Sequence, residues 1–219
     1  MFSNLFGGRF NQAPATVNLV IINVLFFLAS LMLKHTNFDV TMSMWYLKSH
    51  MFKFWQPLTH MFMHASFGHI FFNMFGLLMF GNLLERVWGT PRFLLFYFTC
   101  GFGAALIQQF AYAYEIFQLT GQWFPHYEMG MVLGASGAIV GIFVAFAMLF
   151  PNTEMYMMFI PIPIKAKYAV LIMVAIDLFG GLGYHIPGQG NVANFAHLGG
   201  ALFAFIMILI WKRQRNSLY

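Results

Sequence analysis

Six apolar segments run through this chain of 219 residues, and each is close to the length of a membrane-crossing helix. They cover residues 17–33, 69–87, 93–112, 134–150, 168–182 and 193–211. About 20 helical residues, each rising about 1.5 Å, cross a hydrocarbon core of about 30 Å. Backbone groups in lipid must be paired within their own segment, which favours helices. The pattern therefore predicts an all-α polytopic membrane protein with a bundle of six transmembrane helices.

The composition excludes other broad classes of protein. Hydrophobic residues make up 60% of the chain and charged residues only 8%, whereas soluble domains carry about 25% charged residues. The apolar content, with 29 Phe and 17 Met, also excludes a disordered chain. The net charge of +5 comes from basic residues that are scattered between the segments and clustered at the C-terminus, so we expect no nucleic-acid partner. The expected surroundings are the lipid bilayer.

The basic residues predict the orientation in the membrane. If both termini are cytoplasmic, eight of the eleven Lys and Arg residues fall on the inner side, as the positive-inside rule requires. We therefore expect a short cytoplasmic segment at residues 1–16, a transmembrane domain at 17–211 and a basic cytoplasmic tail at 212–219. The minimal six-span form, without a transit-like extension, favours the bacterial inner (plasma) membrane.

Three of the predicted helices carry polar residues at the same end. Ser136 lies at the start of the fourth segment, and His197 lies about 9 Å of helix into the sixth. His69 and Asn73 lie at the start of the second. These three helices run from outside to inside in the predicted topology, so their first turns share one depth in the outer third of the membrane. Polar residues inside a membrane are costly, which makes each of them a candidate for function.

This set of residues fits acyl transfer to a serine. The Ser136 hydroxyl is a poor nucleophile until a base takes its proton, and neutral His197 can be that base. Attack on a peptide carbonyl creates an oxyanion, which fixed donors must stabilise. His69 and Asn73 are four residues apart, so their N–H groups share one helix face. Backbone N–H groups in the first turn around Ser136 lack intrahelical acceptors and add to these donors.

Each of these residues also has a structural interpretation. Gly134, Gly137 and Gly141 form a small-residue face of the kind that usually packs against another helix. An isolated histidine inside a membrane is more often a packing or relay residue. The shared depth of the polar residues favours catalysis. Asp177, near the outer end of the fifth segment, suits either a third catalytic residue or a carboxylate that extends to the interface, and we leave it out of the predicted site.

Three histidines offer a rival, metal-binding interpretation. His60 and His64 are four residues apart, a spacing that suits metal ligands on one helix face, and His69 follows. No Asp, Glu or Cys lies near them in the sequence to complete a site. We therefore expect no bound metal, and we expect His60 and His64 to hold their loop against the second segment by hydrogen bonds.

Several separated motifs resemble the rhomboid intramembrane serine proteases. They are Trp55-Gln56, Thr59-His60, His64, His69-Ile70-Phe71-Phe72-Asn73, Glu85 with Gly89, Gly134-Ala135-Ser136-Gly137, and Ala196-His197-Leu198-Gly199-Gly200 with Ala204. Together they extend from about Trp45 to Trp211. Two positions depart from the pattern: many bacterial members have Arg where Gln56 stands, and some have a Tyr, stacked on the base, where Val140 stands.

The resemblance implies a fold and a reaction. Rhomboids are six-helix serine proteases that cleave single-span membrane proteins within or beside the transmembrane segment, commonly after a small residue. The resemblance implies that Ser136 is the nucleophile and His197 the base of a Ser–His dyad without an essential acid. It also implies an oxyanion hole made by His69, Asn73 and the Ser136 backbone N–H. Neither a metal nor an organic cofactor is expected.

The resemblance also implies supporting residues. Gly134 and Gly137 flank the nucleophile and let neighbouring backbones approach, and Gln108 in the third segment helps to hold water. Residues 183–194, after the fifth segment, form a cap over the site by the same resemblance.

Two other functions stay open at this stage. The alternative to an intramembrane serine endopeptidase is a catalytically silent rhomboid-like protein that binds or escorts membrane proteins. Loss of Ser136 or His197 would be its mark, and both residues are present. A small transporter would place charges and broken helices near the middle of the bilayer, whereas the polar residues here gather at one side.

Overall fold

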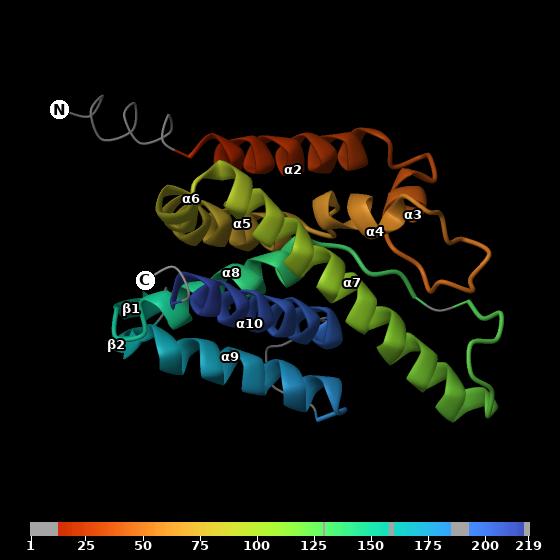
Figure 1. The fold of residues 1–219 in the computed structure, drawn as a ribbon. Coiled ribbons are helices and arrows are strands. Elements are labelled where there is room, and N and C mark those ends of the chain that lie inside the picture. Colours follow the sequence, from red (N-terminus) through yellow and green to blue (C-terminus); the bar gives the residue numbers. More distant parts are fainter. Residues whose placement is uncertain (1–12, 129, 158–159, 185–192, 217–219) are drawn as a thin grey trace.

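The computed structural model describes residues 13–128, 130–157, 160–184 and 193–216, which form a bundle of helices (Figure 1). The long helices are α2 (Pro14–Met32), α5 (Phe67–Gly76) continued by the π-helical turn η2 (Leu77–Gly81) and α6 (Asn82–Trp88), α7 (Thr90–Thr120), α8 (Ser136–Leu149), α9 (Ala166–Gly181) and α10 (Asn194–Asn216). Each predicted apolar segment coincides with one of these helical stretches. The helical character of the six segments is thereby confirmed.

Four helical stretches of the described residues are long and apolar enough to cross a membrane. They are Pro14–Met32, Phe67–Trp88, Thr90–Thr120 and Asn194–Arg213. The helix α8 has 14 residues and α9 has 16, which is short of the about 20 that cross an average bilayer. These four helices make the chain an integral membrane protein, and the count of six spans stays a prediction.

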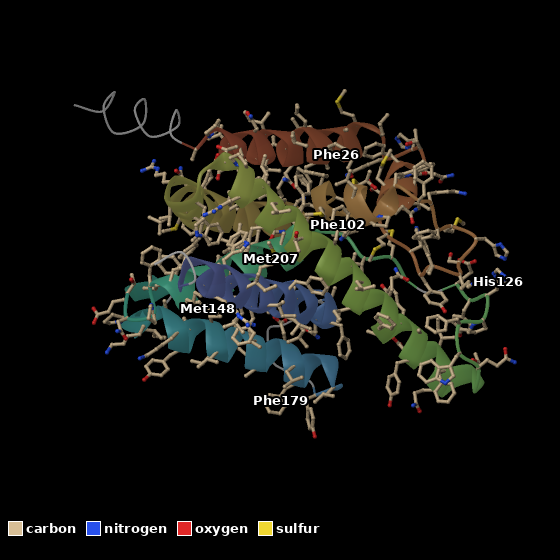
Figure 2. The ribbon with its side chains drawn as sticks, in the orientation of Figure 1. Phe26, Phe102, His126, Met148, Phe179 and Met207 are labelled. Atoms are coloured by element: carbon tan, nitrogen blue, oxygen red, sulfur yellow. The ribbon has the colours of Figure 1, made fainter. Side chains whose placement is uncertain are left out.

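Large apolar side chains cover the outside of these helices. Leu95 of α7, Leu171 of α9 and Ile210 of α10 are each more than half exposed. Phe179 of α9 points away from the bundle (Figure 2). Monomeric soluble proteins rarely expose a contiguous apolar surface of this extent, so the outer face of the bundle suits lipid.

The helix α7 extends further than the sequence predicted. It continues to Thr120, whereas the predicted segment ends at Tyr112. Glu115, which lies beyond the predicted segment, belongs to the residue types that favour helices. The helix ends at Gly121, which adopts a left-handed conformation with φ of 71° and donates its N–H to the carbonyl oxygen of Phe117.

A small β-hairpin between α8 and α9 was not predicted. The strands β1 (Glu154–Met157) and β2 (Ile160–Lys165) pair antiparallel, with Glu154 opposite Lys165. Pro161 and Pro163 argue against a strand in the middle of a sheet. Both strands of this two-stranded sheet are edge strands, however, so proline is tolerated. The hairpin is the exception to the predicted all-α fold.

Glycines bring α8 and α10 into backbone contact. The helix α10 packs against α7, α8 and α9 (Figure 1). A Cβ added at Gly200 of α10 would overlap the carbonyl oxygen of Gly137 in α8. One added at Gly141 would lie 3.2 Å from the Gly200 oxygen and 2.7 Å from Cys100 Sγ in α7. The small-residue face seen in the sequence is therefore the packing face of α8.

Glu85 joins three helices through a buried carboxylate. Its Oε1 accepts hydrogen bonds from Ala15 N (2.9 Å) and Thr90 Oγ1 (2.6 Å). Its Oε2 accepts from the backbone N and the Oγ1 of Thr16, both at 2.8 Å. The N–H groups in the first turn of α2 have no intrahelical acceptor, so the carboxylate caps that helix. Glu85 thus holds α2 against α6 and the start of α7.

We expect Glu85→Gln to lower the free energy of unfolding by about 2 kcal/mol, because the charged hydrogen bonds are lost and the amide NH₂ faces donors. Unfolding of the purified protein by sodium dodecyl sulfate measures the loss. Glu115→Gln, on the exposed face of α7, is the matched control and should leave unfolding unchanged. Equal behaviour of the two variants would contradict the capping role of Glu85.

Candidate active site

Ser136 is the first residue of α8, which follows a sharp turn at Gly134. Gly134 has φ of +132°, a conformation that residues with side chains rarely adopt. Its N–H donates to the carbonyl oxygen of His60 (2.9 Å), which ties the turn to the short helix η1 (His60–Phe62). Ser136 therefore lies at a helix N-terminus, where backbone N–H groups are available to a bound acceptor.

His197 lies in the first turn of α10, and its side chain reaches Ser136. The distance from His197 Nε2 to Ser136 Oγ is 2.8 Å, which is a hydrogen bond. The contact between Gly200 and Gly137 lies within one helical turn of both residues, on the same two helices. The close approach of the backbones therefore sets the distance between the imidazole and the hydroxyl.

The absence of a side chain at Gly134 leaves a space that faces two predicted site residues. A Cβ there would lie 2.9 Å from His69 Nε2 and 3.5 Å from Ser136 Oγ. His69 is held in the first turn of α5, where Ser66 caps the helix by accepting from the His69 backbone N–H (3.1 Å). The imidazole of His69 and the hydroxyl of Ser136 thus border the same space.

Asn73 lies one turn after His69 in α5, and its amide is buried. Its Nδ2 has no hydrogen-bond partner among the described residues. A buried hydrogen-bond donor without a partner costs free energy, so a native protein usually keeps one only where it serves a function. An acceptor on a bound substrate would satisfy it.

A cavity of about 10 Å³ adjoins Ser136, with His60, Gly134 and Ala196 in its wall. This volume holds about one water molecule. Gln108 of α7 is buried, and its Oε1 has no hydrogen-bond partner among the described residues. No described hydrogen bond joins it to Ser136. Of the expected cap, residues 185–192 lie outside the described part of the chain.

His64 contacts the second helical segment, as expected, through its ring, whereas the His60 side chain bonds within its own loop. Burial lowers the pKa of both side chains to about 4, so both are neutral near pH 7. The His64 ring lies edge-on against His69 of α5, with centroids 5.0 Å apart. The His60 Nδ1 lies 3.0 Å from the Gln56 carbonyl oxygen, within its own loop, and the His60 backbone carbonyl accepts from the Gly134 N–H before α8. Within the described residues, no three His, Cys, Asp or Glu side chains are grouped to hold a metal ion.

The Rhomboid domain family model matches residues 51–214, about three quarters of the chain. The chain belongs to the rhomboid family. The matched region of this rhomboid contains Ser136, His197, His69 and Asn73.

Curated relatives carry the same family name. RHOMBOID-like protein 6, mitochondrial, from Arabidopsis thaliana is 30% identical over 74% of this chain and 48% of that protein. Rhomboid protease AarA from Providencia stuartii is 28% identical over 72% of this chain and 56% of that protein. Presenilin-associated rhomboid-like protein, mitochondrial, from Mus musculus is 31% identical over 70% of this chain and 38% of that protein. The matches thus span about half the length of these relatives or less.

These relatives do not support the predicted compartment. Two of the three names contain the word mitochondrial, and the third protein comes from a bacterium. The bacterial inner membrane expected for this rhomboid was inferred from its minimal form alone. The apolar helices support an integral membrane protein, and the comparisons give no preference for the bacterial membrane.

Gln56 replaces the arginine of many bacterial rhomboids and holds the first loop together. It is fully buried in the short helix α4 (Gln56–Thr59). Its Nε2 donates to the carbonyl oxygens of Thr41 (3.2 Å) and Met51 (3.0 Å), and its Oε1 accepts from Trp45 N (3.3 Å). An uncharged amide therefore braces the loop. Val140, the second departure, is buried in α8.

Asp177 of α9, which was not among the predicted site residues, contacts the base. Its Oδ1 lies 3.0 Å from His197 Nδ1, and the residue is only 4% exposed. The fifth and sixth segments are antiparallel neighbours, so the end of one and the start of the other share a depth. That relation was sufficient to find the contact. In the sequence, a third catalytic residue and a carboxylate that extends to the interface suited Asp177 equally, so it was not included in the predicted site.

Proposed function

We propose that this rhomboid is an intramembrane serine endopeptidase, which hydrolyses peptide bonds within or beside the transmembrane segments of other membrane proteins. The observation that carries the proposal is the 2.8 Å hydrogen bond between Ser136 Oγ and His197 Nε2. A base at this distance can take the hydroxyl proton while the oxygen attacks a carbonyl carbon. The relative named Rhomboid protease AarA supports a protease function.

In the first half of the proposed reaction, Ser136 Oγ attacks the carbonyl carbon of the scissile peptide bond. His197 Nε2 takes the hydroxyl proton, and the carbonyl oxygen becomes an oxyanion. Collapse of this intermediate breaks the C–N bond, and His197 returns the proton to the leaving amine. The products of this half are a free amine on one fragment and an ester between the other fragment and Ser136.

The oxyanion is proposed to lie in the space beside Gly134. His69 Nε2 faces this space, and the backbone N–H groups at the start of α8 are close to it. The Asn73 amide, buried without a described partner, supplies a further donor. Donors that are fixed before the reaction stabilise the developing charge without reorganisation, which is commonly the largest contribution to such catalysis.

In the second half, water hydrolyses the ester. His197 Nε2 takes a proton from the water as its oxygen attacks, and then returns it to Ser136 Oγ. The cavity beside Ser136 has room for about one water molecule, which suits storage next to the acyl group. Gln108 and Gly137 are proposed to support this region. The scheme requires neither a metal nor a cofactor.

The proposed topology has six spans, with α8 and α9 crossing as short helices and both termini on the cytoplasmic side. The start of α2, the end of α10 and the hairpin lie at one end of the bundle (Figure 1). Arg86, Lys165 and Lys212 belong to elements that meet at this end. The positive-inside rule makes that end cytoplasmic, which places the site near the opposite surface. The transmembrane domain is then 17–211, flanked by segments 1–16 and 212–219.

We expect a fluorophosphonate, which reacts with activated serines, to label the wild-type protein in liposomes at Ser136. The His197→Ala variant should lose labelling, because the hydroxyl then has no base. Mass spectrometry of the labelled peptide identifies the modified residue.

Ser30→Ala, which removes a serine of α2, is the control and should label like the wild type. If a reagent of this class fails to modify Ser136 in folded protein, the serine is not activated. The chain would then be the catalytically silent, client-binding alternative.

A further inference from the structure

The His197 imidazole is held between two oxygen atoms that come from different helices. Its Nε2 lies 2.8 Å from Ser136 Oγ of α8, and its Nδ1 lies 3.0 Å from Asp177 Oδ1 of α9. Both ring nitrogens therefore have a partner at hydrogen-bond distance. The ring joins the serine to a carboxylate in one continuous chain of hydrogen bonds.

The chemistry of the two partners decides which nitrogen carries the proton. A carboxylate can only accept a hydrogen bond, so Nδ1 must be the donor to Asp177. A neutral imidazole has one N–H, and Nε2 is then left as the acceptor for the Ser136 hydroxyl proton. This tautomer is the one that a general base for Ser136 requires.

The surroundings strengthen the effect of the carboxylate. Asp177 is 4% exposed, and its side chain is directed to α10 instead of the aqueous interface. Transfer of the Ser136 proton turns His197 into an imidazolium, and a negative charge 3.0 Å away stabilises it. Coulomb interactions between groups removed from water are less screened than those at a surface.

We infer that Asp177 is a positioning residue that holds His197 in the productive tautomer and stabilises its protonated form, so that this chain operates a Ser136–His197–Asp177 triad. The inference rests on the proposed function, and it differs from the acid-free dyad that the family resemblance implies. Asp177 acts through His197 and does not contact the substrate.

The competing role for Asp177 is purely structural, as a link between α9 and α10. Loss of such a link would destabilise the fold. The cleavage rate would then fall only in proportion to the fraction of folded protein. A positioning role affects the proton transfer itself, so kcat falls while KM, which reports substrate binding here, is unchanged. A smaller folded fraction also lowers the apparent kcat at unchanged KM, so the rate is divided by the folded fraction, which unfolding in detergent measures. Only a positioning role lowers kcat per folded molecule.

The test uses the full chain in liposomes with a single-span substrate whose transmembrane segment contains a helix-breaking Gly-Pro pair. We expect Asp177→Asn to lower kcat about 100- to 10,000-fold, because the amide can donate to Nδ1 and favour the wrong tautomer, with KM within about twofold of wild type. Asp39→Asn, at the only other aspartate of the chain, is the matched control and should keep full kcat.

A second variant keeps the test decisive if Asp177→Asn does not fold. Asp177→Ala leaves a space that formate can enter. The added carboxylate should raise the kcat of this variant at least tenfold. A kcat for Asp177→Asn within threefold of wild type, or an Asp177→Ala variant that formate does not rescue, would overturn the inference. The wild-type protein in the same assay distinguishes failure of this inference from failure of the proposed function. If the wild type does not cleave the substrate, the proposed function is rejected.

Discussion

Ser136→Ala and His197→Ala should each reduce cleavage of a single-span substrate by about 10⁴- to 10⁶-fold, which leaves only background hydrolysis. Without Oγ there is no acyl-enzyme, and without the imidazole the hydroxyl proton has no acceptor at 2.8 Å. Because the two residues act in one step, the double variant should be no slower than either single variant. Initial rates of product formation in liposomes measure all three.

Both variants should remain folded, which distinguishes chemistry from stability. Neither side chain contributes to the backbone contact between α8 and α10, so detergent unfolding should change little. His126→Ala, in the loop between α7 and α8 where His126 Nδ1 lies 3.0 Å from the Lys48 carbonyl oxygen, is the histidine control and should cleave normally. Residual cleavage above a hundredth of wild type in a folded Ser136→Ala variant would contradict the assigned nucleophile.

The sequence predicted the helices because lipid imposes a simple rule. A segment in hydrocarbon must pair its own backbone groups, so each apolar run of sufficient length is a helix whatever its neighbours are. The predicted topology then gave Ser136, His197 and His69 one depth, since helices that run in the same direction share a depth at their first turns. The structure places Ser136 beside His197, and beside the space that His69 also borders.

Features that the lipid rule does not govern were not predicted in the same way. The extension of α7 to Thr120 lies beyond the apolar run, where helix propensity and Gly121 set the end. The hairpin contains prolines that are acceptable only because both strands are at an edge. The role of Asp177 depends on the packing of α9 against α10, which brings its Oδ1 to 3.0 Å from His197 Nδ1. The sequence left two roles open for this residue.

The glycines show that packing and catalysis are the same property here. Taken alone, Gly137 and Gly141 indicated a helix contact, and Ser136 in the same run indicated chemistry. In the structure, the chemistry of Ser136 depends on the helix contact, because the contact of Gly137 with Gly200 sets the distance between Ser136 and His197. Neither interpretation of the motif excludes the other.

Gly200→Ala should therefore lower the free energy of unfolding by roughly 3 kcal/mol, since overpacking forces the backbone to shift. The added methyl group would overlap the Gly137 carbonyl oxygen, and a main-chain atom cannot turn aside as a flexible side chain can. Separation of α8 from α10 also moves His197 away from Ser136, and a misplacement of about 1 Å costs about 100-fold in rate. Denaturation by sodium dodecyl sulfate and initial cleavage rates measure the two losses.

Gly68→Ala is the matched control, because a Cβ at Gly68 of α5 meets no atom within 4 Å. Alanine favours a helix over glycine by about 1 kcal/mol, so this variant should be as stable as the wild type or more stable. The same chemical change thus has opposite expected signs at two helical positions. If Gly200→Ala left the free energy of unfolding unchanged or raised it, the space between α8 and α10 would accommodate a methyl group. The close backbone contact would then not set the distance between Ser136 and His197.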